Sequence, residues 1–337
     1  MSKTAILSGG GGSIGIHVIS YFLEKTDWSI VSIDSFHHKG YRDRLKRVLQ
    51  DHPEWKDRVR EVQHDLTCPI SPEMIKNIGA VDYILHLAAL SDVFFSIENP
   101  VYTVQNNINS TLTMLEYARS VKPSLFLYFS TDETLGPVKK GDAHPENHPH
   151  RPSNAYASAK AASEDICYAY WRSYGIPLVI TRTMNNFGEF QSSSKFPVII
   201  QKKVESGETV TIHGNDKEIG TRFYIHSRSS ADALLYIIQN LPPHLHEQGQ
   251  LDEPSRYHVV GERAVSNLEL AQTIAGLMGK ELKYEIVDFH RDNPAHDIDY
   301  GLQDNKLRKH GWRAPLNLED GLAQTISWQQ ENKEWIE

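Results

Sequence analysis

The chain has 337 residues, of which 39% are hydrophobic and 23% charged, and its formal net charge at pH 7 is −8. This length predicts a large hydrophobic core divided between two lobes. The negative balance argues against a nucleic-acid-binding surface, and no apolar run approaches the roughly 20 residues that span a bilayer. Cys68 and Cys167 are too few for a disulfide framework or a thiolate metal site, and the amino terminus runs directly into a strand, so we expect a cytoplasmic protein.

Strand and helix patterns alternate through the first half of the chain. Short apolar strands are predicted at 4–8, 30–33, 59–63, 83–87, 125–129 and 178–181, and helices at 14–24, 101–121 and 154–174. This alternation predicts an α/β fold with a doubly wound parallel sheet, the Rossmann arrangement.

The pattern loosens after residue 183, where proline and glycine separate shorter elements. Helices are predicted at 229–240, 268–279 and 318–332. We therefore expect a Rossmann domain at 1–182 and a smaller mixed α/β lobe for the substrate at 183–337, with segments near 222–260 returning to the main sheet.

The segment 142–150 holds three histidines between prolines. A metal site is one interpretation, but a proline-rich loop holds ligands poorly, and the histidines lack the helical spacing of hydrolytic zinc sites. We predict no metal, and an exposed loop or a lid.

A glycine-rich turn joins the first strand to the first helix. Gly9, Gly12 and Gly15 follow the strand at the spacing that lets backbone amides approach a pyrophosphate at a helix start. Asp34 ends the second strand, where an acid binds an adenosine ribose and repels a 2′-phosphate. A glycine turn or an acid alone is weak evidence, but together in this order they predict NAD binding.

Two hydroxyls and two carboxylates, Ser130 to Glu133, follow the apolar strand at 125–129. In an open parallel sheet, ligands bind at this edge. Tyr156 and Lys160 share one helix face, and a nearby ammonium is expected to lower the pKa of the tyrosine. The adjacent acids, Asp132 and Glu133, cannot both ionise easily in a dry site, so one can act as an acid and the other as a base.

With these pieces in place, the chain resembles the extended short-chain dehydrogenases/reductases and, more narrowly, the nucleoside-diphosphate-hexose 4,6-dehydratases of the dTDP-glucose type. The resemblance rests on SGGGGSIG at 8–15, Asp34, Asp65 with Leu66, HLAA at 86–89, STDE at 130–133, Tyr156, Lys160, RTMNNFG at 182–188, Arg222, and NPAHD at 293–297. Thr131, Asp132 and Glu133 favour a dehydratase, since epimerase relatives usually lack the paired acids.

The resemblance implies binding residues for a cofactor and a substrate. It implies NAD held by Gly9, Gly12, Ser13, Ile14, Gly15, Asp34, Ser35, Asp65, Leu66, Leu87, Ala88, Ala89, Asn106, Ser130, Tyr156, Lys160 and Asn186. It implies a sugar nucleotide held by Ser91, Thr131, Asn185, Lys195, Phe196, Arg222, Arg291 and His296.

The resemblance also implies the reaction and its catalytic residues, Thr131, Asp132, Glu133, Tyr156 and Lys160. Tyr156 takes the proton from the sugar O4 while C4 is oxidised, with Thr131 bonded to the same region. Glu133 then removes the C5 proton and Asp132 protonates the departing C6 hydroxyl. Hydride returns to C6, and the product is a 4-keto-6-deoxy sugar nucleotide.

Several residues depart from the dehydratase pattern, among them Leu90, Asp92, Glu189 and Asn293, and they leave the donor open; Arg291 could substitute for an arginine that Asn293 replaces. One alternative is a sibling enzyme: a 4-epimerase, a decarboxylase, or a dehydratase with a 5,6-unsaturated product. The other is a non-catalytic NAD-binding scaffold. The helices at 101–121 and 154–174 carry wide apolar faces, which either pack on the sheet alone or, as in the family, pair two copies into a homodimer.

Overall fold

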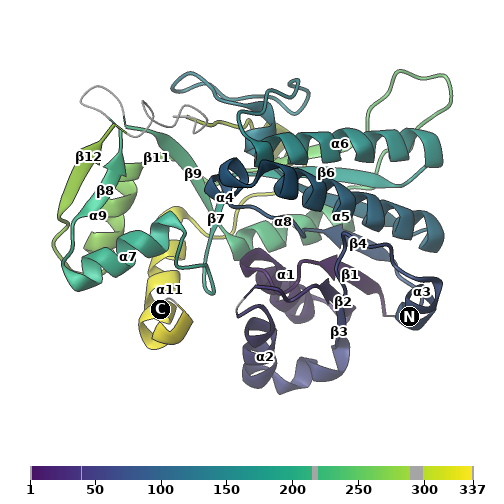
Figure 1. The fold of residues 1–337 in the computed structure, drawn as a ribbon, viewed down its shortest axis with the longest axis horizontal. Coiled ribbons are helices and arrows are strands. Elements are labelled where there is room, and N and C mark those ends of the chain that lie inside the picture. Colours follow the sequence, from purple (N-terminus) through teal and green to yellow (C-terminus); the bar gives the residue numbers. More distant parts are fainter. Residues whose placement is uncertain (1, 39, 215–218, 289–298, 336–337) are drawn as a thin grey trace.

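Seven parallel strands form the main sheet, in the order β3-β2-β1-β4-β5-β6-β10 (Figure 1). They are β1 (Thr4–Ser8), β2 (Ser29–Asp34), β3 (Val59–Gln63), β4 (Tyr83–His86), β5 (Leu125–Thr131), β6 (Leu178–Thr183) and β10 (Ser255–Val259). The computed structural model describes residues 2–38, 40–214, 219–288 and 299–335. The predicted doubly wound parallel sheet is confirmed.

The central strands are apolar because both faces of the sheet are covered. All residues of β5 are buried, whereas the edge strand β3 leaves Arg60 and Glu61 exposed. A buried parallel strand has no solvent face, so it reads as a continuous apolar run. The strand β5 continues to Thr131, so Ser130 and Thr131 belong to the strand and do not follow it.

Helices cover the two faces of this sheet. One face carries α3 (Pro72–Ile78), α4 (Val93–Glu98), α5 (Pro100–Val121) and α6 (Ala155–Tyr174). The other face carries α1 (Ser13–Lys25), α2 (Tyr41–Asp51) and α8 (Ser227–Asn240), with the turn η1 (Pro53–Arg58) beside α2. Met114 and Trp171 are fully buried on the first face and Phe22 and Leu234 on the second, so each face has its own core.

A smaller mixed α/β lobe follows the main sheet. Its strands are β7 (Asn185–Phe187), β8 (Val210–His213), β9 (Thr221–His226), β11 (Ala264–Ser266) and β12 (Tyr284–Val287). Its helices are α7 (Phe196–Ser206), α9 (Asn267–Leu277) and α11 (Leu318–Glu331). Ile200, Ile212, Leu270 and Leu322 form part of one buried cluster, which is the core of this lobe.

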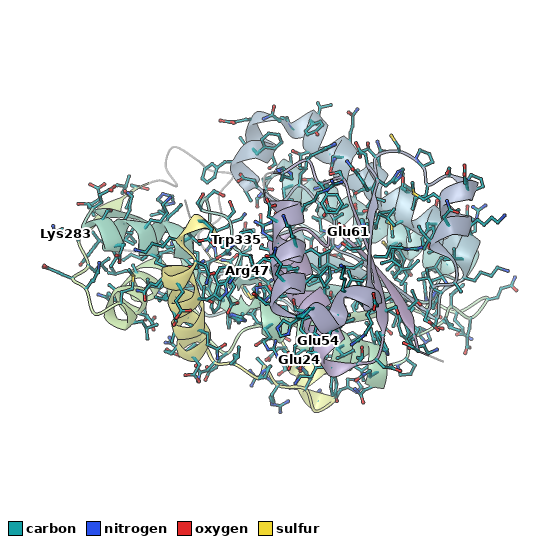
Figure 2. All side chains as sticks on the ribbon, turned by 90° about the horizontal axis from the view of Figure 1, so that it is seen from below. Glu24, Arg47, Glu54, Glu61, Lys283 and Trp335 are labelled. Carbon is teal, nitrogen blue, oxygen red and sulfur yellow. The ribbon has the colours of Figure 1, made fainter. Side chains whose placement is uncertain are left out.

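The chain crosses between the lobes several times. Helix α8 packs on α1, β10 pairs with β6, and α10 (Asn305–Lys309) contacts β10. The turns η2 (Asp132–Leu135) and η3 (Lys333–Trp335) complete the elements. Trp335 is labelled in Figure 2. The centroid of its ring lies 4.9 Å from that of Phe190 and 6.4 Å from that of Trp328.

Five helices of the described residues were not predicted: α2, α3, α4, α7 and α10. Helix α2 has only Leu45 and Val48 as buried apolar residues, and α3 and α4 are two turns or less. Such segments lack the apolar periodicity that predicts a helix from sequence. Within the described ranges, no helix has the length and apolarity that a bilayer span requires.

Candidate active site

The carboxyl ends of β1, β4, β5 and β6 meet at one edge of the main sheet. The chain order along the sheet reverses between β1 and β4, so the connections from these strands leave on opposite faces. Ligands of open α/β sheets bind in the crevice that forms at such a switch point. The glycine turn after β1 and the acidic pair after β5 both lie at this edge.

The glycine turn has no room for side chains. A Cβ atom on Gly15 would lie 2.2 Å from the carbonyl oxygen of Gly9, and one on Gly9, whose φ is +76°, would lie 2.9 Å from the backbone of Ala88. Gly12 precedes helix α1 and has no side chain to cap it. This backbone cradle at a helix start suits a dinucleotide pyrophosphate, so the turn fits NAD.

Asp34 lies at the end of β2, where the sequence predicts it. It is buried, and its carboxylate accepts hydrogen bonds from the backbone N–H groups of Gly11, at 3.1 Å, and Phe36, at 2.9 Å. Burial raises its pKa, although these N–H groups stabilise the charged form. Arg44 donates to the carbonyl of Gly11 at 2.8 Å, so α2 forms a wall of the turn that the sequence did not reveal.

The segment after β4 is held by a helix residue. Asn107 of α5 is buried, accepts from the backbone N–H of Leu90 at 2.8 Å and donates to its carbonyl at 3.0 Å. Asn106, which the resemblance implies for the cofactor, is the half-buried residue before it. Asp92, which departs from the dehydratase pattern, caps α4 by accepting a hydrogen bond from Phe95 N–H at 3.0 Å. The cap is a structural reason for an aspartate at this position.

The remaining residues implied for the cofactor lie on several loops at or near the same edge. Asp65 accepts from the backbone and hydroxyl of Thr67, which lowers its pKa, and Leu66 is buried. Ser13 starts α1 together with Ile14, and Ser35 follows β2. Leu87, Ala88 and Ala89 follow β4, half-buried, and Ser91 is exposed.

The acidic pair lies at the end of β5 with unequal environments. Asp132 is 5% exposed and accepts a hydrogen bond from the Thr131 hydroxyl at 2.9 Å, whereas Glu133 is half-buried. Burial, reinforced by the neighbouring charge of Glu133, raises the pKa of Asp132 to about 7. The structure thus contains one carboxyl group that holds a proton near neutral pH beside another carboxyl group.

Tyr156 and Lys160 lie on α6. The expectation that the ammonium of Lys160 lowers the pKa of Tyr156 is wrong. The ammonium of Lys160 donates to the carbonyl of Phe129 at 2.7 Å and lies 4.1 Å from the ring centroid of Tyr128. Burial raises the pKa of Tyr156, and the charges of Glu133 and Asp132 raise it further, while a hydrogen bond with Thr131 opposes the shift. Burial lowers the pKa of Lys160 to about 8.

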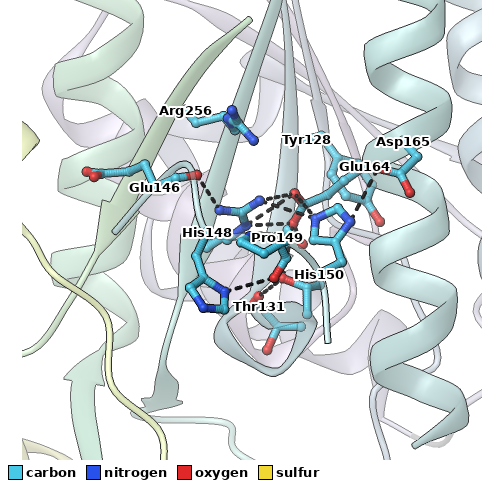
Figure 3. Close-up of polar contacts among 12 residues, drawn as sticks. Tyr128, Thr131, Glu146, His148, Pro149, His150, Glu164, Asp165 and Arg256 are labelled. Carbon is cyan, nitrogen blue, oxygen red and sulfur yellow. Dashed lines mark hydrogen bonds and ion pairs between the residues drawn. The ribbon is translucent and has the colours of Figure 1, made fainter. Parts of the chain in front are cut away.

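A buried ion pair stands behind this centre (Figure 3). Arg182 of β6 and Glu164 of α6 are 1% and 2% exposed, and their closest N–O distance is 2.6 Å. Glu164 also accepts from the hydroxyl of Ser130 at 2.5 Å and lies 3.1 Å from His150. The pair therefore ties the end of β5 to the helix that carries Tyr156, a link that no local motif indicates.

The histidine-containing loop is attached at several points. Arg182 donates to the carbonyl of Glu146 at 2.9 Å, and His144 forms a backbone bridge with Leu302. The rings of His144 and His148 lie 3.7 Å apart between centroids. The loop thus packs on the chain near 299–303 and on the ion pair of Figure 3.

Several residues implied for the substrate lie in the smaller lobe. Asn185 is exposed on β7, while Lys195 and Phe196 are half-buried at the start of α7. Arg222 of β9 is buried 4.8 Å from the ring centroid of Tyr300, and its charge acts to lower the pKa of Asp132. Arg291, Asn293 and His296 lie outside the described residues.

Asn186 is fixed by neighbours on two sides. Its amide donates to the Thr183 hydroxyl at 3.1 Å and accepts from the Ser230 hydroxyl at 2.6 Å. Glu189, a departure from the family pattern, contacts His226 of β9 at 3.3 Å, and its carbonyl lies 3.0 Å from the ring nitrogen of His17. Glu189 therefore joins α1 to the smaller lobe.

Comparisons with known proteins identify the family of the chain. The family model described as GDP-mannose 4,6 dehydratase matches residues 6–325. The dTDP-glucose 4,6-dehydratase of Haemophilus influenzae is 28% identical over 96% of each chain, and the low-salt glycan biosynthesis protein Agl12 of Haloferax volcanii is 30% identical over 96% of this chain and 97% of its own.

Among solved structures, DesIV from Streptomyces venezuelae, a dTDP-glucose 4,6-dehydratase with NAD and TYD bound, is similar with a TM-score of 0.84 and 26% identity over 99% of each chain. The chain therefore belongs to the GDP-mannose 4,6 dehydratase family of extended short-chain dehydrogenases/reductases.

Proposed function

We propose that this protein is an NAD-dependent nucleoside-diphosphate-hexose 4,6-dehydratase, a hydro-lyase that converts the hexose of a sugar nucleotide to its 4-keto-6-deoxy form. The relatives named dTDP-glucose 4,6-dehydratase and the DesIV structure with NAD and TYD support this activity. The observation that carries the proposal is the pair Asp132 and Glu133 beside Tyr156, with the pKa of Asp132 raised to about 7.

NAD, when bound, supplies the two-electron acceptor and donor for the oxidation at C4 and the reduction at C6. Gly9, Gly12 and Gly15 would hold its pyrophosphate, and Asp34 would accept from its ribose. Asn186, held by Thr183 and Ser230, would lie at the nicotinamide end.

The proposed roles at C4 belong to Tyr156 and Thr131. The phenol of Tyr156 is buried near Thr131, and the two hydroxyl oxygens would together bind a sugar hydroxyl. Tyr156 would accept the O4 proton. Lys160 would hold ribose hydroxyls from its place on the same face of α6.

The proposed roles in elimination divide between the two acids. Glu133 would remove the C5 proton, which the neighbouring ketone makes acidic. Asp132 would protonate the departing C6 hydroxyl, and a carboxyl group whose pKa is about 7 can still carry that proton at neutral pH. A 4-epimerase needs no such pair, since its ketone is reduced again at C4.

The donor is proposed to bind across both lobes. Arg222 and Lys195 would neutralise the diphosphate, and Asn185, Phe196 and Ser91 would contact the sugar or the base. Arg291 and His296 remain predictions from the sequence. We further propose a cytoplasmic location, because Cys68 and Cys167 are both free thiols.

A homodimer through α5 and α6 is also proposed. Val101 and Tyr102, at the start of α5, are 67% and 55% exposed, and Phe95 and Ile97 of α4 are exposed beside them. Contiguous exposed apolar side chains of this kind mark interaction sites. Sedimentation should give twice the chain mass, and replacing Val101 and Tyr102 by lysine should give the single chain mass; a monomeric wild type would contradict the proposal.

The activity is tested by incubation with dTDP-glucose, UDP-glucose, UDP-GlcNAc, GDP-mannose and CDP-glucose, followed by mass analysis. Loss of one water from one donor is expected, and a new C6 methyl signal by NMR distinguishes the 4-keto-6-deoxy product from a 5,6-unsaturated one. An unchanged mass with every donor, although NAD is bound, would refute the proposal and favour an epimerase or a scaffold.

A further inference from the structure

Asn154 connects the start of helix α6 with the side chain of Glu133. Its Oδ1 atom accepts from the backbone N–H of Ala157 at 2.8 Å, which caps the helix. Its Nδ2 atom donates to Oε2 of Glu133 at 3.0 Å. These two contacts determine the orientation of the amide. In the reverse orientation, the amide N–H would face the N–H group of Ala157 and the amide oxygen would face the carboxylate of Glu133.

The side chain of Asn154 is buried within the candidate active site. Asn154 is 8% exposed and lies on the same helix start as Tyr156. Glu133 is held from its other side by its own backbone, whose N–H donates to the Thr131 hydroxyl at 3.4 Å. One asparagine therefore fixes the acid of η2 relative to the tyrosine of α6.

The hydrogen bond also acts on the charges of the dyad. An N–H group that donates to a carboxylate stabilises the charged form, so it favours an ionised Glu133. After burial, that charge is the main reason why the pKa of Asp132 is raised to about 7. Thr131 of β5, Tyr156 of α6 and Arg222 of β9 also act on this dyad.

We propose that Asn154 is a positioning residue that orders the two acids, by holding Glu133 as the charged base and thereby leaving the proton on Asp132. This inference rests on the proposed dehydratase function and adds to it a residue that acts through Glu133. A neutral donor suits this task, because a lysine at the same place would add a charge that also draws the proton from Asp132.

Replacing Asn154 by serine or aspartate distinguishes its action on Glu133 from its action as a helix cap. Both side chains cap helices about as well as asparagine, and neither offers an N–H group to Glu133. Asn154→Ser loses the amide N–H group and leaves only a shorter hydroxyl, without adding charge, and Asn154→Asp places a second negative charge against Glu133. Ser71→Ala, which removes the side-chain cap of another helix, α3, is the control for the loss of a cap.

The test measures the two half-steps separately over a range of pH in the full chain with NAD bound. Absorbance of reduced nicotinamide follows oxidation, and deuterium uptake at C5 from heavy water follows proton removal by Glu133. For Asn154→Ser we expect near wild-type oxidation and C5 exchange slowed by about tenfold to a hundredfold at neutral pH. The acid limb of the pH profile of C5 exchange should move to higher pH, because Glu133 then ionises at a higher pH. Asn154→Asp should move that limb further.

Two results would overturn the inference. An unchanged pH profile of C5 exchange in Asn154→Ser, or the same shift of that profile in Ser71→Ala, would reduce Asn154 to a helix cap. Should Asn154→Ser fail to fold, Asn154→Asp carries the same comparison. If the wild type shows neither C5 exchange nor water loss, the proposed function itself fails. If the wild type reacts normally and the pH profile of Asn154→Ser is not shifted, only the inference about Asn154 fails.

Discussion

The buried pair of Glu164 and Arg182 gives a prediction that the geometry makes quantitative. The change is Glu164→Gln, which keeps the shape of the side chain and removes its charge. Arg182 would then remain 1% exposed with its guanidinium facing a neutral amide, after losing contacts at 2.6, 3.0 and 3.2 Å to the carboxylate. An uncompensated charge in a buried site is strongly destabilising.

The expected loss is about 3–5 kcal/mol in the free energy of unfolding, the range for breaking one side of a buried pair. The hydroxyl of Ser130 also loses its charged acceptor at 2.5 Å, so the loss should lie toward the upper part of this range. By contrast, the exposed pair of Arg47 and Asp51 should contribute only about 0.3–0.5 kcal/mol.

Urea denaturation at fixed protein concentration provides the measurement, with Asp51→Asn as the exposed control. Arg182→Met and the double variant Glu164→Gln with Arg182→Met complete a double-mutant cycle for this pair. The double variant should lose less stability than the sum of the single changes, since it leaves no unpaired charge. A loss below about 1 kcal/mol for Glu164→Gln would refute the reasoning that links burial to this interaction.

The same pair predicts a sign for the pH dependence of stability. Burial alone would raise the pKa of Glu164, but Arg182 and His150 lower it well below its ordinary value. A depressed pKa contributes stability that is present above the unfolded value of about 4.3 and is lost as the pH falls below it. Wild type should therefore lose more stability than Glu164→Gln between about pH 5 and pH 2.

Three further predictions concern the catalytic centre. Glu133→Gln should stall the reaction after oxidation and leave the absorbance of reduced nicotinamide; normal turnover would contradict the role of Glu133. Asp132→Asn should slow water loss by about 10²–10⁴, and the wild-type rate of elimination should fall above about pH 7, where Asp132 loses its proton; a flat profile across that pH would contradict its role as the acid. Gly15→Ala should abolish bound NAD, measured by release on denaturation, because the new methyl group would lie 2.2 Å from the Gly9 carbonyl oxygen; full retention of NAD would contradict the cradle.

Much of the fold could be predicted because it depends on local spacing. The run from Leu125 to Phe129 is apolar because both faces of β5 are covered, and the alternation of such runs with helices leaves few topologies. Predicted ends were less accurate: β5 and β6 continue to Thr131 and Thr183, since buried polar residues can end a strand without breaking its ladder.

The site could be predicted where a short motif carries its chemistry. Gly9, Gly15 and Asp34 are recognisable in order along the chain, and the structure places them at one edge of the sheet. The expected effect of Lys160 on Tyr156 was wrong because spacing along a helix gives a shared face but not the direction of a long side chain. Lys160 instead bonds to the carbonyl of Phe129.

By itself, therefore, the sequence determined the doubly wound sheet, the dinucleotide turn and the identity of the paired acids, all of which follow from residues close together in the chain. Only the tertiary structure decided how those acids are held. Asn154 meets Glu133, and Arg182 meets Glu164, across separations of 21 and 18 residues. Burial then sets which carboxyl keeps its proton, because the energy of a charge depends on its three-dimensional surroundings, which no local pattern records.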